Sequence, residues 1–389
     1  MKSYTEFNYQ RVCKVQLIGG NIMQTVYDNR CGSLLSRAHE LGIEKILIGK
    51  PLNIFYLTGI MINPYERFLA LLLDTKNNQC TMILPSLEKG IAEKQQIPEI
   101  LIRDDEDPVK KLAGVLGTCN SVALEMDYFP MAFGEKLKEY SQKILLMDCS
   151  GMVIAQRMYK DDKEIEMIQM AAHYGDLVLE ETKAFIREGN TEKQLQFELF
   201  RAMSIKPGVV TDSFIIQVLS GERSANPHGT AGDRKFQKGD PVTIDYGVNY
   251  QNYWSDYCRT FFLGRPDSRL EQIYNVVLAA QMAAIEKVRP GIPVKFIDLT
   301  ARQIIEKAGY GDQFIHRTGH GLGIDIHENP KIHSTSEETL KEGMVFTIEP
   351  GIYIPGLGGV RIEDDVVVTK NGVKVLNKFP KGLSDMILD

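Results

Sequence analysis

The sequence predicts two domains: an α/β domain over residues 29–157, followed by an α+β domain over residues 158–389. Three observations carry this prediction. Short apolar runs alternate with amphipathic stretches in the first part, the pattern changes to a long helical repeat after Ile154, and one segment recurs in the second part. A chain of 389 residues is long enough for two domains, each with its own core.

The first domain is predicted from short elements of alternating type. Residues 1–28 show no sustained strand or helix pattern, so we treat them as an unexplained extension. From residue 29 on, six apolar runs are typical of strands, and two amphipathic stretches between them are typical of helices. The strand candidates are EKILIGK, FLALLLD, CTMILP, EILIRD, SVALEMD and KILLMD, and the helix candidates are DPVKKLAGVLG and MAFGEKLKEYS.

A long helix is predicted at the start of the second domain. The stretch KDDKEIEMIQMAAHYGDLVLEETKAFIREG carries apolar residues at helical spacing for several turns. Asp161 and Asp162 open it, where carboxylates favour the positive end of the helix dipole, and Gly189 closes it.

An internal repeat predicts that the second domain is a duplicated half-domain. The segment Gly239–Gly247 matches Gly343–Gly351 as G-x-x-[VF]-T-I-[DE]-x-G, at an offset of 104 residues. Helical sequence precedes both copies, which indicates two units of helices followed by a hairpin, with their sheets facing each other. Each copy places one carboxylate, Asp245 or Glu349, in an apolar strand, which is unfavourable unless a cation meets it.

Composition excludes several kinds of partner. The net charge is −6 and there is no long Lys/Arg block, so the sequence shows no basic patch that would bind nucleic acid or an anionic membrane. The six cysteines are scattered without a C-x-x-C pair, which argues against a zinc ribbon or a disulfide framework. No apolar stretch approaches the roughly eighteen residues that would span a bilayer. We therefore expect a cytoplasmic protein that acts on a small molecule.

Two hairpins are expected to bring four carboxylates together. In VTIDYGVNYQNYWSDYCRTFF, β-rich runs flank a polar turn at residues 250–252, so Asp245 and Asp256 would lie on neighbouring strands. Two carboxylates this close stay ionised together only if a cation lies between them; otherwise one takes up a proton. The run VFTIEPGIYIPGLGGVRIEDDVVV repeats the arrangement with Glu349 and Glu363.

A histidine in a glycine-rich segment supplies a fifth candidate ligand. His320 lies in HRTGHGLGIDIHE, where flanking glycines allow close approach of the backbone. One imidazole and four carboxylates suit two Mn, Co, Fe or Zn ions better than a closed structural zinc site, with Mn or Co as our first expectation. Each residue alone also has an ordinary interpretation: Asp256 and Glu363 as solvated or salt-bridged groups, His320 as a packed loop residue. The joint pattern favours the metal site.

These residues carry a resemblance to a known family. The motifs SGERSANPHG, DYG, SDYCRT, HRTGHGLGIDIHE, TIEPGIY and GGVRIED occur in one order, and the chain resembles the metal-dependent peptidases of the pita-bread fold. This group holds methionine aminopeptidase, Xaa-Pro aminopeptidase and prolidase. The resemblance runs from about Asn29 to the end and implies a creatinase-like amino-terminal domain, which is typical of the Xaa-Pro branch, before a pita-bread catalytic domain.

The resemblance implies a role for each candidate ligand. Asp245 would hold one metal ion, Asp256 and Glu363 would bridge two ions, and His320 and Glu349 would complete the second. Glu349 would also act as the general base that takes a proton from water and passes it to the leaving proline nitrogen.

Four further residues are candidates for substrate contacts. By resemblance, His228 and His327 would contact the substrate and the tetrahedral intermediate, although loop histidines also commonly satisfy backbone groups. Arg361 lies two residues before Glu363 and would share its face, where it could orient a carboxylate or substrate, or form a plain cross-strand salt bridge. Lys331 stands where prolidases often carry arginine for the free carboxylate of a dipeptide, but lysine lacks the bidentate fork.

The expected activity is hydrolysis of Xaa-Pro bonds in small peptides, most simply dipeptides, as in prolidase. Three alternatives stay open at this point: an Xaa-Pro aminopeptidase acting on longer peptides, a creatinase-like hydrolase that works without metal, and an inactive binding module of the same fold. The expected partners are a small peptide substrate and, from the habit of the family, a second copy of the chain in a homodimer.

Overall fold

The structure, a computed structural model, describes residues 22–211 and 216–389 of the chain. It divides into two compact units, Met1–Arg157 and Met158–Asp389. The predicted extension at residues 1–28 lies largely outside the described residues, but the first helix, α1 (Ile22–Glu40), begins within it.

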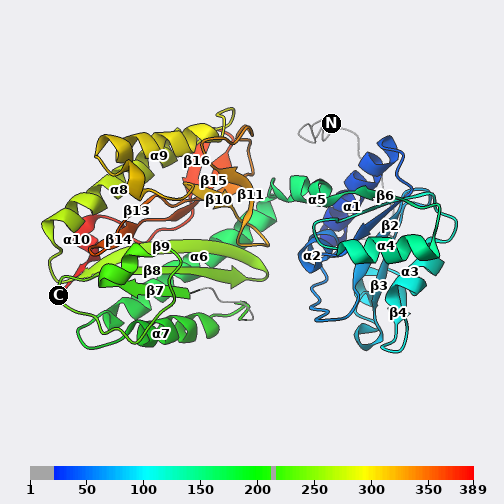
Figure 1. The fold of residues 1–389 in the computed structure, drawn as a ribbon, viewed down its shortest axis with the longest axis horizontal. Coiled ribbons are helices and arrows are strands. Elements are labelled where there is room, and N and C mark those ends of the chain that lie inside the picture. Colours follow the sequence, from blue (N-terminus) through cyan, green and yellow to red (C-terminus); the bar gives the residue numbers. More distant parts are fainter. Residues whose placement is uncertain (1–21, 212–215) are drawn as a thin grey trace. The chain divides into compact units, whose positions relative to one another are not determined.

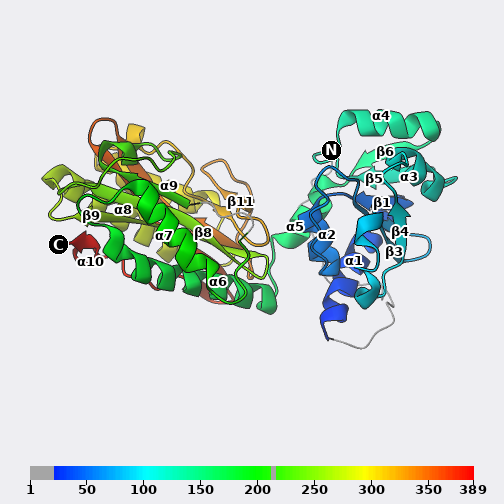
Figure 2. The same ribbon diagram turned by 90° about the horizontal axis from the view of Figure 1, so that it is seen from below.

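The amino-terminal unit is built around a six-stranded mixed sheet with the order β4-β3-β2-β1-β5-β6. Helices α3 and α4 cover one face of this sheet, and α1 and α2 pack on the other (Figures 1 and 2). All six predicted strands and both predicted helices are confirmed. The strands are β1 (Lys45–Ile48), β2 (Ala70–Asp74), β3 (Gln79–Pro85), β4 (Glu99–Ile102), β5 (Ser121–Leu124) and β6 (Leu145–Asp148), and the two helices are α3 (Pro108–Leu116) and α4 (Met131–Tyr140).

Two further helices of this unit have no clear sequence signal, α2 (Pro51–Thr58) and α5 (Ser150–Arg157). Most of α2 is buried, so its sequence lacks the polar face from which a surface helix is recognised. The helix ends at Gly59, whose φ of 74° is a left-handed conformation that glycine adopts without strain.

The second unit begins with the predicted long helix, which is shorter than expected. In α6 (Asp162–Thr182), Asp161 and Glu164 form a capping box that satisfies free backbone N–H groups. The helix does not reach Gly189, because the chain tightens into a 3₁₀ turn at Lys183–Phe185.

The duplicated half-domain is confirmed. Figure 1 shows the strands of the second unit between α6 and α7 on one side and α8 and α9 on the other. The first copy contributes α6, α7 (Glu192–Ser204) and strands β7, β8 and β9, and β17 from the end of the chain completes their sheet in the order β17-β9-β8-β7. The second copy contributes α8 (Ser268–Lys287), α9 (Lys295–Lys307), a sheet of order β11-β10-β12-β15-β16 and the separate pair β13-β14.

The strands of the second unit have the following bounds: β7 (Ile216–Ser220), β8 (Pro241–Tyr250), β9 (Tyr253–Leu263), β10 (Gly319–Gly321), β11 (Glu328–Ile332), β12 (Val345–Ile348), β13 (Gly351–Ile354), β14 (Gly358–Arg361), β15 (Asp364–Thr369), β16 (Gly372–Val375) and β17 (Ile387–Leu388). The short helix α10 (Leu383–Met386) precedes β17. One continuous apolar core lies between these strands and the four long helices.

The repeated sequence segment has a structural cause. Gly239 and Gly343 have φ values of 88° and 84°, and each stands two residues before a strand, β8 or β12. A side chain is rarely tolerated at such φ values, so glycine recurs at the turn that enters each strand. The repeated carboxylates, Asp245 and Glu349, occupy the same position in the sequence after these glycines.

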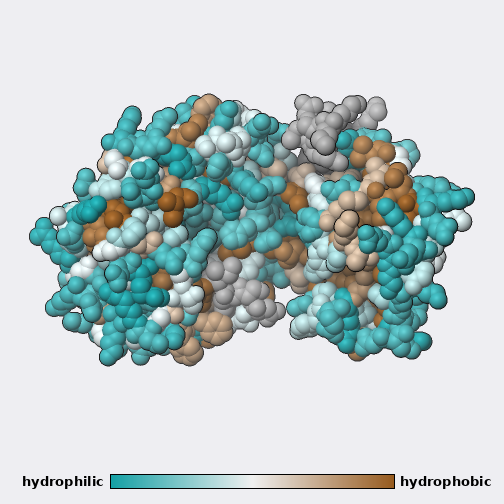
Figure 3. Space-filling view, in the orientation of Figure 1, coloured by the Kyte–Doolittle hydropathy of each residue, from teal (hydrophilic) through white to brown (hydrophobic). Residues whose placement is uncertain are grey.

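The surface is mixed in character. On the face shown in Figure 3, hydrophilic residues cover most of each unit, and smaller hydrophobic patches interrupt them. Several large apolar side chains are exposed, among them Tyr65 and Met131 in the amino-terminal unit. Within the described residues, no helix combines the length and the apolar character needed to cross a membrane.

Candidate metal centre

The first hairpin places two of the predicted ligands on adjacent strands. Strands β8 and β9 are joined by Gln251 and Asn252, which have φ values of 49° and 69°, as a tight type I′ turn requires. In the resulting register Asp245 faces Cys258, and Gly247 faces Asp256. Because side chains alternate along a strand, Asp256 and Cys258 point to the same face as Asp245.

The second hairpin carries the other two carboxylates at the positions where its strands are interrupted. Strand β12 pairs with β15 and β13 pairs with β14, so Glu349 and Glu363 fall in the two breaks between these ladders. The backbone N–H of Glu363 donates to the carbonyl of Cys258 at 3.1 Å, which joins the two hairpins. The duplicated halves therefore meet at their carboxylates.

His320 is held in β10 by close backbone packing. A Cβ atom at Gly319 would lie 1.9 Å from the carbonyl oxygen of Thr347, and one at Gly321 would lie 2.1 Å from that of Asn329. The flanking glycines are therefore required for β10 to fit between β12 and β11. The His320 amide donates to the hydroxyl of Thr347 at 3.1 Å, and this hydroxyl in turn donates to Glu349 at 3.3 Å.

The structure brings all five predicted ligands together. One ligand atom each of Asp256, His320 and Glu363 lie within 4.8 Å of one another. His320 Nε2 is 3.5 Å from Asp256 Oδ2 and 3.4 Å from Glu349 Oε1, and Asp245 and Glu363 belong to a second such group. The candidate metal centre is defined by these five residues, Asp245, Asp256, His320, Glu349 and Glu363.

Burial and mutual repulsion disfavour the ionised carboxylates. Burial, followed by the charges of neighbouring carboxylates, raises the pKa of Asp256 and of Glu363 well above their usual range. Burial also raises the pKa of Glu349 to about 7. Oε1 of Glu363 is buried and, among the described residues, has no hydrogen-bond partner. An orphaned buried oxygen among repelling carboxylates fits a site for divalent cations.

The protonation state of His320 also fits a metal ligand. Burial, assisted by the neighbouring His327, lowers the pKa of His320 to about 3. The imidazole is therefore neutral at pH 7 and has a lone pair available on one ring nitrogen. The rings of His320 and His327 are 4.3 Å apart between centroids, so the second histidine lies directly beside the centre.

We expect the metal-free protein to lose stability between about pH 7 and pH 8. Asp256 and Glu363 have raised pKa values, so each favours its protonated form in the folded state, and this contribution is lost as pH rises. A carboxyl group that holds its proton only when folded lowers the free energy of unfolding by about 1.4 kcal/mol per pH unit. The lowered pKa values of His316, His320 and His327 contribute little here, since these imidazoles are mostly neutral in both states above their usual pKa of about 6.5.

Urea denaturation of chelated protein at the two pH values measures this slope. The same experiment with saturating Mn²⁺ is the control, because cations would neutralise the carboxylates and flatten the dependence. A chelated protein that becomes more stable as pH rises would contradict the expected repulsion.

Arg361 is already engaged within the protein. Its Nη2 forms a salt bridge with Asp245, and its Nη1 donates to the hydroxyl of Tyr353 at 2.8 Å. Burial disfavours the charge of Arg361, but Asp245 and then Tyr353 outweigh this effect and raise its pKa. The salt bridge with Asp245 is compatible with both predicted alternatives, a guanidinium that orients a carboxylate and a plain cross-strand salt bridge.

The remaining predicted residues lie around the centre with exposed side chains. His228 follows Pro227, whose carbonyl accepts from Arg361 at 3.4 Å, and the ring of His327 lies tilted beside that of His320. Lys331 stands opposite His320 in the β10–β11 register. The side chains of His228, His327 and Lys331 are exposed.

Several neighbours of the centre were missed by sequence reasoning. Thr347 and Cys258 contact or face predicted ligands, and Tyr353 contacts Arg361. Strand alternation could have identified Thr347 and Cys258, which stand two residues from Glu349 and Asp256. Lys160 forms a buried ion pair with Glu328, beside His327. No sequence signal relates Lys160 to a residue so far along the chain.

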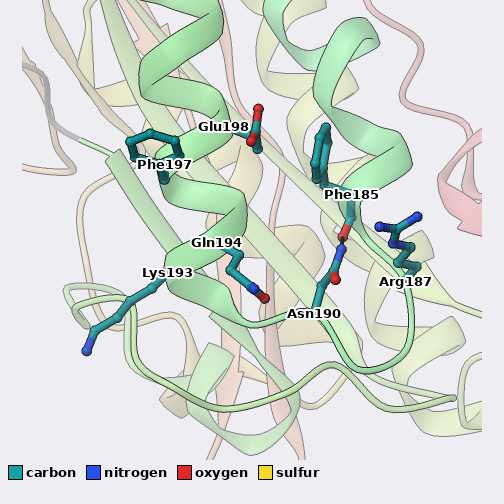
Figure 4. Close-up of a pocket in the computed structure, with 7 residues that line it drawn as sticks. All are labelled: Phe185, Arg187, Asn190, Lys193, Gln194, Phe197 and Glu198. Atoms are coloured by element: carbon teal, nitrogen blue, oxygen red, sulfur yellow. Dashed lines mark hydrogen bonds between the residues drawn. The ribbon is translucent and has the colours of Figure 1, made fainter.

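A pocket of about 330 Å³ lies elsewhere in the second unit. Figure 4 shows its lining side chains around the start of α7 and the turn that precedes it. It is lined by Phe185, Arg187, Asn190, Lys193, Gln194, Phe197 and Glu198. The pocket contains none of the predicted site residues, so the candidate metal centre is the better candidate for chemistry.

Comparison with known proteins identifies the family. Residues 166–370 match metallopeptidase family M24. The chain belongs to this family. Residues 30–159 of this M24 peptidase match the creatinase/prolidase N-terminal domain, as the resemblance predicted.

Individual M24 relatives extend the match over nearly the whole chain. A putative dipeptidase, YkvY, from Bacillus subtilis is 40% identical over 365 residues, which cover 91% of this chain and 99% of the relative. The crystal structure of a prolidase from Thermococcus sibiricus is 36% identical with a TM-score of 0.86, covering 93% of this chain and 99% of that one. An Xaa-Pro dipeptidase from Bacillus anthracis is 34% identical with a TM-score of 0.85, covering 93% and 100%. The chain is therefore a prolidase-like metallopeptidase.

Proposed function

We propose that this M24 peptidase hydrolyses Xaa-Pro dipeptides with two divalent metal ions held by Asp245, Asp256, His320, Glu349 and Glu363. Mn²⁺ or Co²⁺ is the preferred ion, since oxygen-rich ligand sets with one imidazole suit both. One observation carries the proposal: four carboxylates and a neutral imidazole converge in one centre, where the buried Oε1 of Glu363 has no hydrogen-bond partner among the described residues. The names of the similar prolidase and dipeptidases support the substrate class.

The bound ions would supply an activated water and polarise the scissile carbonyl. The protein contributes the proton transfers. Glu349, at the edge of the centre, would accept a proton from water and deliver it to the proline nitrogen, which departs only when protonated. The hydroxyl of Thr347 orients this carboxylate through its 3.3 Å hydrogen bond.

The exposed side chains beside the centre would hold the substrate. His228 and His327 are candidates for hydrogen bonds to the peptide and to the oxyanion of the tetrahedral intermediate. Lys331 offers a positive charge to the free carboxylate of a dipeptide, although as a point charge without a bidentate fork. Arg361, engaged with Asp245 and Tyr353, would keep the Asp245 carboxylate in place.

Paired substrates test the proposal. Chelated protein is assayed with an Xaa-Pro dipeptide, an Xaa-Pro-Yaa tripeptide and an Xaa-Ala dipeptide, before and after Mn²⁺ or Co²⁺ is restored. We expect cleavage of the Xaa-Pro dipeptide only after metal is restored. The Xaa-Ala dipeptide is the matched control for proline specificity.

The other outcomes separate the alternatives. Cleavage mainly of the tripeptide would assign an Xaa-Pro aminopeptidase, and cleavage of the dipeptide by fully chelated protein would contradict metal dependence. Absence of any cleavage after metal is restored would favour another substrate or a binding function.

A further inference from the structure

Cys258 lies between two of the candidate metal ligands. It is the cross-strand partner of Asp245 in the β8–β9 ladder, and it also forms a β-bridge with Glu363. Residues that face each other across antiparallel strands project from the same side of the sheet. One ligand atom each of Asp245, Cys258 and Glu363 therefore lie within 4.8 Å of one another. The thiol therefore lies beside the carboxylates of both Asp245 and Glu363.

The hydrogen bonds around Cys258 do not explain why a thiol and two carboxylates lie so close together. Sγ of Cys258 is 3.7 Å from the carbonyl oxygen of Arg361, which is a weak hydrogen bond. Glu363 is only 1% exposed, and its Oε1 has no hydrogen-bond partner among the described residues. A buried carboxylate oxygen without a partner indicates a ligand that binds there.

The donor atoms around Cys258 match a thiophilic divalent cation. They combine one sulfur with carboxylate oxygens of Asp245 and Glu363, and the guanidinium of Arg361 also pairs with Asp245. Sulfur ligands select soft or borderline ions such as Zn²⁺ and Cd²⁺, whereas carboxylates alone favour Mn²⁺.

We propose that Asp245, Cys258 and Glu363 form a site for thiophilic divalent ions, with the Cys258 thiolate as a direct ligand. On binding, a metal–sulfur bond forms and the thiol proton passes to solvent. The proposal rests on the proposed function for the metal-binding character of Asp245 and Glu363. Because those two residues are shared, a thiophilic ion would displace Mn²⁺ from the peptidase centre, so Cd²⁺ would inhibit the enzyme by competition.

Spectroscopy of the chelated full-length chain tests the metal–sulfur bond directly. Co²⁺ is added to the wild type, to Cys258→Ser and to Cys149→Ser, which removes another buried thiol that lies in the amino-terminal unit. We expect a sulfur-to-cobalt charge-transfer band in the near ultraviolet for the wild type and Cys149→Ser, and none for Cys258→Ser. Absence of the band in the wild type, or its persistence in Cys258→Ser, overturns the proposal.

Metal affinity provides a second measurement. Calorimetric titration with Cd²⁺ should show a loss of at least about tenfold for Cys258→Ser, while Mn²⁺ affinity changes by less than about threefold. Equal losses for both ions would mean that the thiol only supports the carboxylates, and would overturn the proposal. Circular dichroism checks folding, and Cys258→Ala replaces the serine variant if that variant does not fold.

The outcome is separable from that of the peptidase proposal. Mn²⁺-dependent cleavage without a cobalt–sulfur band would leave the proposed function standing and remove the thiophilic site. A cobalt–sulfur band in a protein that cleaves no Xaa-Pro peptide would support the thiophilic site and contradict the proposed function.

Discussion

Replacing Glu363 by glutamine is expected to reduce Xaa-Pro hydrolysis by more than about 100-fold, since even outer partners of metal ligands typically contribute 10- to 100-fold. Glu363 has this large effect because it belongs to both groups of ligand atoms in the centre. An amide keeps the shape of the side chain but removes the negative charge that would bind the ions. Steady-state kinetics with added Mn²⁺ and measurement of bound metal check the prediction together.

The same substitution is not expected to lower the stability of the metal-free protein, although it lowers activity. In metal-free protein, burial and then the charges of Asp256, Glu349 and Asp245 raise the pKa of Glu363. Removing this charge should leave chelated Glu363→Gln at least as stable as the chelated wild type at about pH 8. The matched control is Glu342→Gln, which changes an exposed carboxylate and should alter neither property. A Glu363→Gln protein that keeps wild-type activity would exclude Glu363 as an essential ligand.

Replacing Lys160 by methionine is expected to destabilise the folded chain by about 3–5 kcal/mol, the usual effect of removing one partner from a buried ion pair. Nζ of Lys160 is 3.1 Å from Oε2 of Glu328, and the two side chains are 1% and 5% exposed. Oε1 of Glu328 accepts from the backbone N–H of Asp325 at 2.9 Å. The methionine variant would leave the Glu328 carboxylate buried without the ammonium of Lys160.

A double-mutant cycle measures this coupling. The double variant Lys160→Met/Glu328→Gln should recover part of the lost stability in urea denaturation, because no buried charge is then left unbalanced. The exposed pair Lys193–Asp233 is the control, where Lys193→Met should change stability by less than about 1 kcal/mol. Equal effects of the two lysine substitutions would show that burial does not strengthen the Lys160 pair.

The Lys160 pair should also affect catalysis. Glu328 directly follows His327 and forms the end of the glycine-rich loop, and a Cβ at Gly323 would lie 2.9 Å from both Glu328 and Lys160 side-chain atoms. The pair therefore packs directly under this loop. We expect a lower catalytic rate for folded Lys160→Met, measured under conditions where circular dichroism shows the variant to be folded.

The elements that sequence reasoning predicted well are those whose signal is local. The six strands of the amino-terminal unit are apolar runs bounded by turn residues, and Asp161 and Glu164 form the capping box that begins α6. Gly239 and Gly343 recur because a positive φ at the same turn needs glycine in each half. The buried helix α2 was missed because a helix without a polar face has no periodic signal.

The candidate site shows the same division. By itself, the sequence predicted the candidate ligands, which are four carboxylates in β-rich hairpins and one histidine between glycines, since carboxylates in apolar strands favour a bound cation. Only the tertiary structure decided how they combine. The β8–β9 register and the bridge to Glu363 place Cys258 between two ligands, and folding brings Lys160 to Glu328. These contacts join residues that are distant in the chain. Strand register and burial create the contacts, and both are properties of the packed fold.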